Sequence, residues 1–590
     1  MVLLDWIVVA VYLAATLGIG IYLARRGSQS IEQFFVSGRS LPWWLAGTSM
    51  AATTFSIDTP LYVAGVVGTR GIAGNWEWWA FGIGHVVLIY VFARLWRRSE
   101  IITDAELIER RYGGKPASVL RGTKAFLFAV PINCIGIGYI MLAAVKVVGT
   151  LGIWEGLGFS AEEQILGMDP KLLTVIGISV LVLAYTGFSG LWGVVATDFF
   201  QFALALFGAL AVAVYAIGSP EVGGLAQLAA RAQAATAFDV LSFVPLTWDP
   251  TSAWRLVWSA TAGISFSTFM AYTLLQWWTF RRSDGGGEFI QRLAASRSEA
   301  EAEKASWLFV IMHYVVRTWP WILVALAALI IYPDLADREL GYPKLMLDYL
   351  PAGILGVAVA SLLAAFMSTV STQINWGASY LVNDLYRRFV KPDATQRELV
   401  VFGRWASLFI TALGAAAAFY ATSILDVFRL VIAMGTGPGM VLILRWFWWR
   451  INASAELAAM LAGVAIGLVT TLVPDLIIAD FGLRLLVITG VTTVIWVSVM
   501  YLTPPETDAT LRAFCESIEP PGPGWKAVRA QYGLRPAQPL QPMLLKSAAA
   551  LALLFGLMFG IGGLLLLRWG VAIGMGVLAA AGYVALRRMD

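Results

Sequence analysis

The stretch SMAATTFSIDTP, residues 49 to 60, interrupts an apolar run that is long enough to cross a membrane. It places hydroxyl side chains, an aspartate and a proline where lipid offers no hydrogen-bond partners. Backbone that leaves the helix at membrane depth persists only where it lines a cavity enclosed by protein. Pro60 removes a donor and favours a helix that restarts just before it. We therefore predict a broken transmembrane helix at a binding site, where the small residues 52 to 54 let backbone approach a guest closely.

Asp58, two residues before this proline, has two alternative roles. Its carboxylate can accept hydrogen bonds from the free N–H groups at the start of the second half-helix, which is the common role of an aspartate in this position. It can also contact a ligand directly. We expect Asp58 to be the N-cap of the second half-helix.

The composition of the whole chain is that of a polytopic membrane protein. Apolar residues make up 59% of the 590 residues and charged residues only 13%, against roughly 25% charged in soluble domains. Apolar windows of about 20 residues recur along the entire sequence. The fifteen expected helices lie near residues 4 to 24, 42 to 68, 74 to 96, 119 to 149, 172 to 190, 194 to 217, 252 to 280, 304 to 332, 351 to 383, 397 to 421, 424 to 448, 455 to 474, 482 to 502, 544 to 567 and 569 to 586. The first is expected to be a retained helix, not a signal peptide, because it lacks a basic leader and a small-residue cleavage site.

Lys and Arg gather in alternate connections between these helices, as they do in cytoplasmic loops. With the N-terminus outside, about 30 of the 41 basic residues fall on one side. The predicted topology places the C-terminus in the cytoplasm, in a cell membrane. The net charge of +4 then reflects membrane orientation, and no nucleic-acid partner is expected.

Three segments are expected outside the membrane. TDAELIERRYGG, residues 103 to 114, begins with a capping-box pattern and predicts a short interfacial helix with its arginines at the headgroups. Residues 281 to 304 are interpreted as a charged cytoplasmic loop with a glycine hinge. Residues 503 to 541 are rich in proline and are interpreted as a cytoplasmic linker before the last two helices.

The sequence offers little for enzymatic chemistry. Cys134 and Cys515 predict neither a disulfide nor a zinc site, because one lies in an expected span and no CxxC spacing occurs. No phosphate-binding loop is present, so ATP-driven transport is not indicated. His85 and His313, the two histidines of the chain, stand in no known catalytic motif. A channel is disfavoured because polar residues cluster near mid-membrane and do not follow whole helices.

A second polar interruption occurs in SATAGISFSTFMAYT, residues 259 to 273. It crosses the membrane in the opposite direction and begins five helices after the first interruption. Two broken helices in corresponding positions of antiparallel halves are typical of inverted-repeat secondary transporters. The alternative is that Gly263 and the serines only allow close helix packing.

Hydroxyl side chains gather in AAFMSTVSTQ, residues 364 to 373. Helical spacing places Ala365, Ser368, Thr369 and Thr372 along one face, with Ser371 close by. A single membrane Ser or Thr usually bonds its own helix backbone. Together with carbonyls freed by a broken helix, the cluster provides the oxygen atoms that a hard monovalent cation needs.

Five segments in order resemble the sodium:solute symporter family. They are GRSLPWWLAGTSMAATTFS (38 to 56), ITDAELIERRYG (102 to 113), YTGFSGLWGVVATDFFQF (185 to 202), IQRLAASRSEAEAEK (290 to 304) and LPAGILGVAVASLLAAFMSTVST (350 to 372). The resemblance implies an all-α, leucine-transporter-like core of two inverted five-helix repeats. The expected units are an extra helix and first loop (1–41), the first repeat (42–217), the second repeat (252–448) and accessory helices with the linker (455–590).

The resemblance also implies sodium sites. The main family site matches carbonyls of Ala52, Phe55 and Ala365 and hydroxyls of Ser368 and Thr369. Some members have a second sodium site, whose positions match Asp198, Ser368, Ser371 and Thr372. Asp198 is alternatively an interfacial carboxylate near a helix start.

For the solute, sugar-carrying members place polar groups at positions matching Thr54, Thr59, Glu77, Thr268 and His313. Amides are usual at several of these positions, and this chain departs from that pattern. Sialic-acid carriers resemble it at Thr54, Ser56 and Thr59, without an identified match for their carboxylate-binding arginine. Tyr272, close to Thr268, is a further candidate.

Glu77 in WEWWAFGIGH is a functional hypothesis because it is an intramembrane carboxylate. Its alternative role is a structural ion pair with His313 or Arg317. The predicted function is sodium-coupled import of a small polar organic solute that is sugar-like, amino-acid-like or an organic anion, by alternating access. The alternative is a transporter-like membrane receptor without net transport.

Overall fold

The computed structural model describes residues 1–27, 36–156, 158–159, 164, 168–252, 255–279, 283–284 and 287–589. Side chains are described for all of these except 20–27, 184–190, 192–193 and 288. Within this part of the chain, eleven helices are long and apolar enough to cross a membrane, and Leu3–Ile19 and Pro170–Leu183 are shorter apolar helices. An all-α polytopic fold is confirmed, whereas the expected number of fifteen spans is not.

The elements of the first half of the chain are α1 (Leu3–Gly27), η1 (Ser37–Arg39), α3 (Trp43–Thr53), α4 (Asp58–Arg70), η2 (Ile72–Asn75), α5 (Trp76–Trp79), α6 (Phe81–Val87), η3 (Leu88–Phe92), α7 (Ala93–Arg98), α8 (Glu106–Arg111), α9 (Gly114–Leu127), η4 (Phe128–Ile132), α10 (Asn133–Thr150), α11 (Ile153–Gly156), α12 (Pro170–Ile217), α13 (Leu225–Ala234), β1 (Leu246–Trp248), β2 (Leu256–Trp258), α14 (Phe266–Leu274) and η5 (Gln276–Trp278). The elements of the second half are α15 (Gly287–Ala295), α16 (Glu299–Val310), η7 (Ile311–Val316), α17 (Thr318–Ile331), η8 (Arg338–Leu340), α18 (Gly341–Tyr349), α19 (Ile354–Ser379), η9 (Tyr380–Val390), α20 (Gln396–Tyr420), α21 (Ile424–Thr436), α22 (Gly439–Phe447), α23 (Ala453–Leu472), η10 (Pro474–Leu476), α24 (Phe481–Leu502), α25 (Asp508–Ile518), α26 (Lys526–Tyr532), α27 (Leu540–Leu565) and α28 (Trp569–Met589).

The predicted break in the first core helix is confirmed. Helix α3 ends at Thr53, and α4 begins at Asp58 after four residues that are not helical. The expected cap is wrong, because Ile57 precedes the helix and no side chain caps it. Asp58 is itself the first residue of α4, so its carboxylate does not occupy the capping position before the helix. The Thr59 N–H instead donates to the Ser56 carbonyl oxygen at 3.1 Å.

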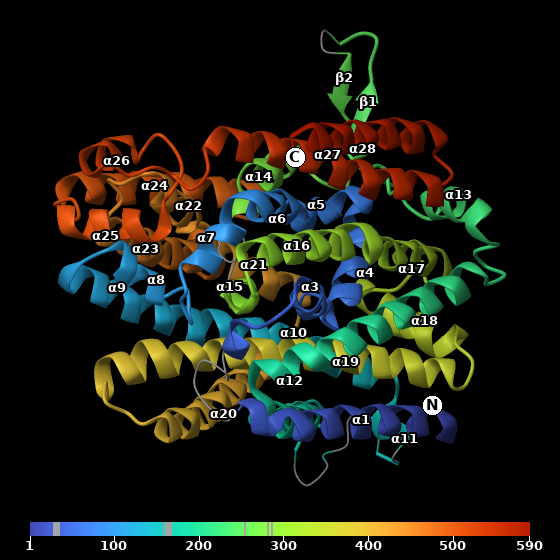
Figure 1. The fold of residues 1–590 in the computed structure, drawn as a ribbon. Coiled ribbons are helices and arrows are strands. Elements are labelled where there is room, and N and C mark those ends of the chain that lie inside the picture. Colours follow the sequence, from blue (N-terminus) through green and yellow to red (C-terminus); the bar gives the residue numbers. More distant parts are fainter. Residues whose placement is uncertain are drawn as a thin grey trace.

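The expected helix 252 to 280 is wrong in its first part. Leu256–Trp258 forms strand β2, paired antiparallel with β1, and helix α14 starts only at Phe266. Large apolar and aromatic residues in this stretch suit a short strand pair, and Ser265 caps α14 by accepting the Thr268 N–H at 3.1 Å. The hairpin projects from one edge of the bundle in Figure 1.

Part of the expected charged loop 281 to 304 is a buried helix. Helix α15 places Phe289, Ile290 and Leu293 in the core at 3.6-residue spacing. Within the expected interruption at residues 259 to 273, residues 259–265 are not helical and α14 begins at Phe266. A further gap in the helical structure separates η5 from α15. Residues 280–282 and 285–286 in this gap lie outside the described residues.

The expected pair of helices at 172 to 190 and 194 to 217 is one element, α12. No proline follows Pro170 within it, so no residue lacks the N–H that continues helical hydrogen bonding. Helix α12 packs against α1, α3 and α19. Figure 1 shows α1 and α20 along one edge of the bundle, and α27 beside α28 along the opposite edge.

Two of the segments expected outside the membrane carry buried side chains. The short helix α8 is confirmed, but Arg111 is buried and donates to the carbonyls of Arg445, Trp448, Trp449 and Ile451. A guanidinium is favourable there because carbonyls at the end of α22 lack helical partners. The expected linker 503 to 541 contains α25 and α26, with Trp525 buried.

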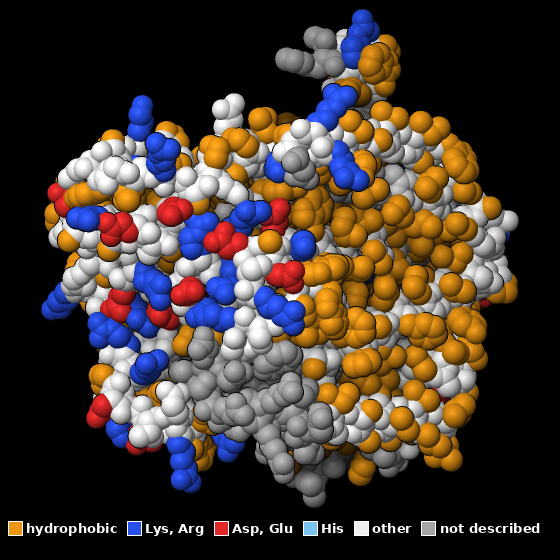
Figure 2. All heavy atoms as spheres, in the orientation of Figure 1, with side chains coloured by type: hydrophobic (Ala, Val, Ile, Leu, Met, Phe, Trp, Pro, Cys, Tyr) orange, Lys and Arg blue, Asp and Glu red, His pale blue; other side chains and the backbone are white. Residues whose placement is uncertain are grey.

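Charged and apolar side chains are separated on the surface. Figure 2 shows a field of Lys, Arg, Asp and Glu over the side of the molecule that carries α8, α25 and α26, and apolar side chains over the adjoining side. Phe200 and Val214 of α12 are among the exposed apolar residues. Such a separation is expected of a membrane protein whose apolar surface contacts lipid and whose charged surface faces water.

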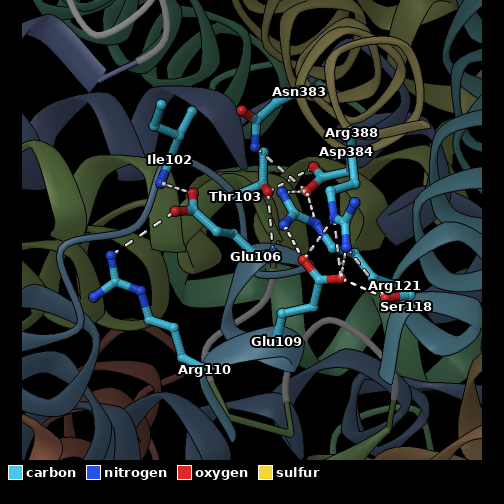
Figure 3. Close-up of polar contacts among 10 residues, drawn as sticks. All are labelled: Ile102, Thr103, Glu106, Glu109, Arg110, Ser118, Arg121, Asn383, Asp384 and Arg388. Carbon is cyan, nitrogen blue, oxygen red and sulfur yellow. Dashed lines mark hydrogen bonds and ion pairs between the residues drawn. The ribbon is translucent and has the colours of Figure 1, made fainter. Parts of the chain in front are cut away.

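An ion-pair network lies on the charged side, joining α8, α9 and η9 (Figure 3). Arg121 Nη1 lies 2.6 Å from Glu109 Oε2, and Arg121 Nη2 lies 2.7 Å from Asp384 Oδ1. Arg388 Nη2 lies 3.0 Å from Glu109. Burial opposes ionisation of Glu109, but hydrogen bonds from Arg388, Arg121 and Ser118 lower its pKa to about 2.

Candidate functional site

A cavity of about 90 Å³ lies at the break between α3 and α4. Four of the expected solute residues, Thr54, Ser56, Thr59 and His313, line it. Thr54 Oγ1 lies 3.0 Å from His313 Nδ1, which links the broken helix to η7. The aromatic side chains in the lining are Tyr62, Trp78, Phe81, Tyr139 and Phe428. The cavity thus combines hydroxyl groups with ring faces, as polar ligand sites do.

Asp58 belongs to this cavity and not to a helix cap. Its Oδ1 atom is buried and has no hydrogen-bond partner among the described residues. A buried carboxylate oxygen without a donor is costly unless a bound molecule supplies one. Asp58 is therefore a candidate contact for a hydroxyl or amine of the solute.

Arg317 binds backbone carbonyl groups at the end of α3. Its Nη1 donates to the Ala51 carbonyl and its Nη2 to the Thr54 carbonyl, both at 2.8 Å. These carbonyls end α3, where a cation complements the helix dipole. One carboxylate, Asp58, and one guanidinium therefore stand at the break, so the site is close to charge balance.

Glu77 lies outside the cavity lining, and its expected partners were wrong. It pairs with Arg429 through Nε at 2.6 Å and with Arg70 through Nη1 at 3.1 Å, not with His313 or Arg317. Its side chain is fully buried, so the two arginines supply the pairing that an intramembrane carboxylate requires.

Two other expected solute residues, Tyr272 and Thr268, lie in the same region as Glu77. Tyr272 accepts a hydrogen bond from Arg70 at 3.3 Å, and Thr268 donates to Asp480 at 3.1 Å. Arg70, Thr268, Arg429 and Asp480 line a separate cavity of about 200 Å³. The seven expected solute residues therefore divide between two places.

The expected sodium residues come from two segments that pack together, the end of α3 and the middle of α19. Thr369 Oγ1 donates to the Thr53 carbonyl at 2.9 Å. The five predicted positions are all buried: Ala52, Phe55, Ala365, Ser368 and Thr369. The hydroxyl cluster thus faces the broken helix, as the sequence predicted.

The four residues of the expected second site also lie together. Asp198 is fully buried and lies well inside α12, so it does not stand near a helix start. Its oxygens accept hydrogen bonds from Ser368 and Ser49, both at 2.5 Å. Thr372 accepts one from Arg292 at 2.8 Å, and Ser371 donates to the Ser368 carbonyl at 3.1 Å.

Several site residues were missed from the sequence. Arg292 was counted with the cytoplasmic loops, although the spacing of Phe289, Ile290 and Leu293 around it is that of a buried helix. Arg70 and Arg429 come from helices that are far apart in the chain, and no local signal pairs them with Glu77. The cavity lining also contains Gln373, Tyr139, Thr53, His85, Ile424 and the expected sodium residue Thr369.

The family model described as "Sodium:solute symporter family" matches residues 34–463. The chain belongs to the sodium:solute symporter family. This symporter is 27% identical over 499 residues to a sodium/glucose cotransporter of Vibrio parahaemolyticus, covering 80% of this chain and 86% of the relative. It is 24% identical over 524 residues to the sodium/sialic acid symporter NanT of Aliivibrio fischeri, and the match covers 85% of this chain and 93% of the relative.

Among solved structures, the symporter is similar to a sodium-coupled sialic acid symporter in a substrate-bound, outward-open state. The TM-score is 0.66 at 21% identity, and the match covers 86% of this chain and 99% of the other. The leucine-transporter-like fold is thereby confirmed. The protein is a sodium-coupled symporter of a small solute in a membrane, sodium is its coupling ion, and its family consists of transporters.

Proposed function

We propose that the symporter imports a neutral solute with several hydroxyl groups, such as a sugar or cyclitol, through the cavity at the break between α3 and α4. The observation that carries the proposal is the lining itself: Asp58 Oδ1 without a partner among the described residues, five Ser and Thr hydroxyls, and the rings of Tyr62, Trp78, Phe81, Tyr139 and Phe428. A carboxylate accepts from solute hydroxyls, and ring faces cover the apolar side of a sugar. Relatives named for glucose, mannose and myo-inositol support the same class.

Sodium is proposed to bind between α3 and α19, on the carbonyls of Ala52, Phe55 and Ala365 and the hydroxyls of Ser368 and Thr369. Thr369 already bonds the end of α3, so an ion there would hold the broken helix against α19. The ion would thereby favour the state that presents the cavity to solute.

The proposed topology has the N-terminus outside and the C-terminus in the cytoplasm. The charged side shown in Figure 2 then faces the cytoplasm. The proposed repeats span residues 42–217 and 252–448, flanked by the first 41 residues and by accessory helices within 455–590. No enzymatic activity is proposed, because the family and the relatives are transporters.

A second candidate is an anionic solute. Arg70 and Arg429 line the cavity of about 200 Å³, and one relative is named for sialic acid. Within that cavity Asp480 and the adjacent Glu77 balance the two arginines, which favours the neutral class.

Uptake into proteoliposomes tests the proposal. Radiolabelled glucose, mannose, myo-inositol and sialic acid are supplied with an inward sodium gradient, and with potassium in its place. We expect saturable uptake of a neutral polyol that requires sodium. Uptake of sialic acid alone would favour the anionic candidate. Solute binding without flux would indicate a receptor.

A further inference from the structure

An apolar groove of about 540 Å³ lies between η9 and α20 and shares no lining residue with the solute cavity. Leu385 and Tyr386 of η9 line it, as do Phe402, Trp405 and Phe409 of α20. The Tyr386 and Phe402 rings stack across the two helices, with 4.1 Å between their centroids. The lining side chains are aliphatic or aromatic throughout, so the groove offers a ligand mainly apolar contact.

Both walls of the groove belong to helices that are long and apolar enough to cross a membrane, Ile354–Val390 and Gln396–Tyr420. The α20 wall is open to the outside, since Trp405 is 65% exposed and Phe409 is 50% exposed. Figure 1 shows α20 along an edge of the bundle. In a bilayer, an open groove on the outside of a membrane span faces the acyl chains of lipid.

One end of the groove lies where η9 ends and α20 begins, on the charged side of the molecule. Arg388 of η9 pairs there with Glu109 of α8, in the network of Figure 3. Lys391 pairs with Glu398 at 2.6 Å in the connection between the two helices. Residues 385 to 405 carry five basic and two acidic side chains, so this end of the groove has an excess of positive charge.

Three arginines supply that excess: Arg387, Arg397 and Arg404. All three are exposed, and the described part of the chain places no carboxylate within ion-pairing distance of them. Arg397 and Arg404 are seven residues apart on one face of α20, and Arg404 adjoins the groove residue Trp405. An arginine within a membrane span is costly without a counter-charge. A lipid phosphate supplies one, because the planar guanidinium binds phosphate through two hydrogen bonds.

We propose that the groove between η9 and α20 binds an anionic phospholipid. One acyl chain lies along Phe402, Trp405 and Phe409, and the headgroup phosphate binds Arg397 and Arg404. The excess of positive charge favours an anionic headgroup over a zwitterionic one. This site is separate from the solute cavity and from the proposed sodium residues, so it does not rest on the proposed solute class.

Native mass spectrometry of the purified, delipidated symporter tests the site through the affinity of the first lipid bound. The probes are dioleoylphosphatidylglycerol and dioleoylphosphatidylcholine, which share their acyl chains and differ in net charge. We expect wild type to bind phosphatidylglycerol more tightly. Arg397→Gln/Arg404→Gln should lower that affinity about tenfold and change phosphatidylcholine binding little. Trp405→Ala should weaken the binding of both lipids, because the acyl chain loses its ring contact.

The matched control is Arg535→Gln/Arg588→Gln, which removes the same charge from two exposed arginines that do not line the groove. Melting temperatures check that each variant is folded. Equal wild-type affinities for the two lipids would overturn the proposal, and so would an undiminished preference for phosphatidylglycerol in Arg397→Gln/Arg404→Gln. An equal loss in the control would show that net charge attracts the lipid, against a site in this groove. A wild-type dimer that Trp405→Ala converts to a monomer would assign the groove to a second copy of the chain instead.

Discussion

The Thr369 hydroxyl donates a hydrogen bond to the Thr53 carbonyl oxygen at 2.9 Å. This bond joins the long helix α19 to the last residue of α3, one position before the chain leaves the helix. The contact places the hydroxyls of α19 beside carbonyls that lack helical partners. The proposed sodium site and the solute cavity therefore share this junction.

Removing the Thr369 hydroxyl should weaken sodium binding. In Thr369→Ala one oxygen ligand is lost, and a lost polar contact of about 1 kcal/mol raises the half-saturating sodium concentration roughly fivefold. Ser368→Ala should act in the same direction. Thr369→Ser keeps the hydroxyl and serves as the control. Sodium-dependent uptake measured over a sodium titration checks this, and an unchanged titration in Thr369→Ala and Ser368→Ala would reject the assigned site.

Asp58→Asn should weaken solute binding while sodium binding stays unchanged. The substitution keeps the shape of the side chain but removes the charge that accepts from the solute. Hydrogen bonds to charged groups contribute about 1.5–3 kcal/mol, so affinity should fall by about tenfold or more. Asp426→Asn in the first turn of α21, which is exposed, is the matched control. Normal solute affinity in Asp58→Asn would show that Asp58 does not contact the solute.

Glu77→Gln should damage folding more than binding. It leaves Arg70 and Arg429 without their carboxylate, and breaking a buried pair typically costs about 3–5 kcal/mol. We expect a lower melting temperature and yield, with normal solute binding per folded molecule. Glu516→Gln, from an exposed pair with Arg512, should leave the melting temperature unchanged. Wild-type stability together with weak solute binding would instead place Glu77 in the solute site.

Acid should weaken the network of Figure 3 through Glu109. Its pKa is lowered from 4.5 to about 2, although burial opposes this, by hydrogen bonds from Arg388, Arg121 and Ser118. A lowered pKa contributes stability that is present above pH 4.5 and is lost as the pH falls towards 2. Melting temperatures of wild type and Glu109→Gln should therefore differ at pH 7 and converge below pH 4.5. A difference that does not change with pH would contradict this role.

The α3–α4 break shows why some of the site was predictable. Polar residues, small residues and a proline within one apolar run are local signals, and the bilayer leaves few structures that satisfy them. The helical spacing of Ser368, Thr369 and Thr372 is equally local. Asp58 was misassigned because a cap and a ligand contact look alike until the first residue of the helix is known.

Residues 256 to 295 show where local signals failed. An apolar run was interpreted as a span, although Leu256–Trp258 pairs with a strand and α15 is buried despite its charges. The loop-charge rule assigns every arginine to solvent or headgroups, so it cannot recognise Arg292, whose charge is neutralised by a carboxylate some ninety residues away.

The sequence by itself determined the membrane class, the family, the broken helix and the hydroxyl face of α19, because each follows from composition or from spacing within one helix. The tertiary structure decided the partners of Glu77, the place of Asp58 in the cavity and the position of Arg292 beside Asp198. These are pairings between distant segments, and buried charges take whichever partners the packed helices bring within a few ångströms.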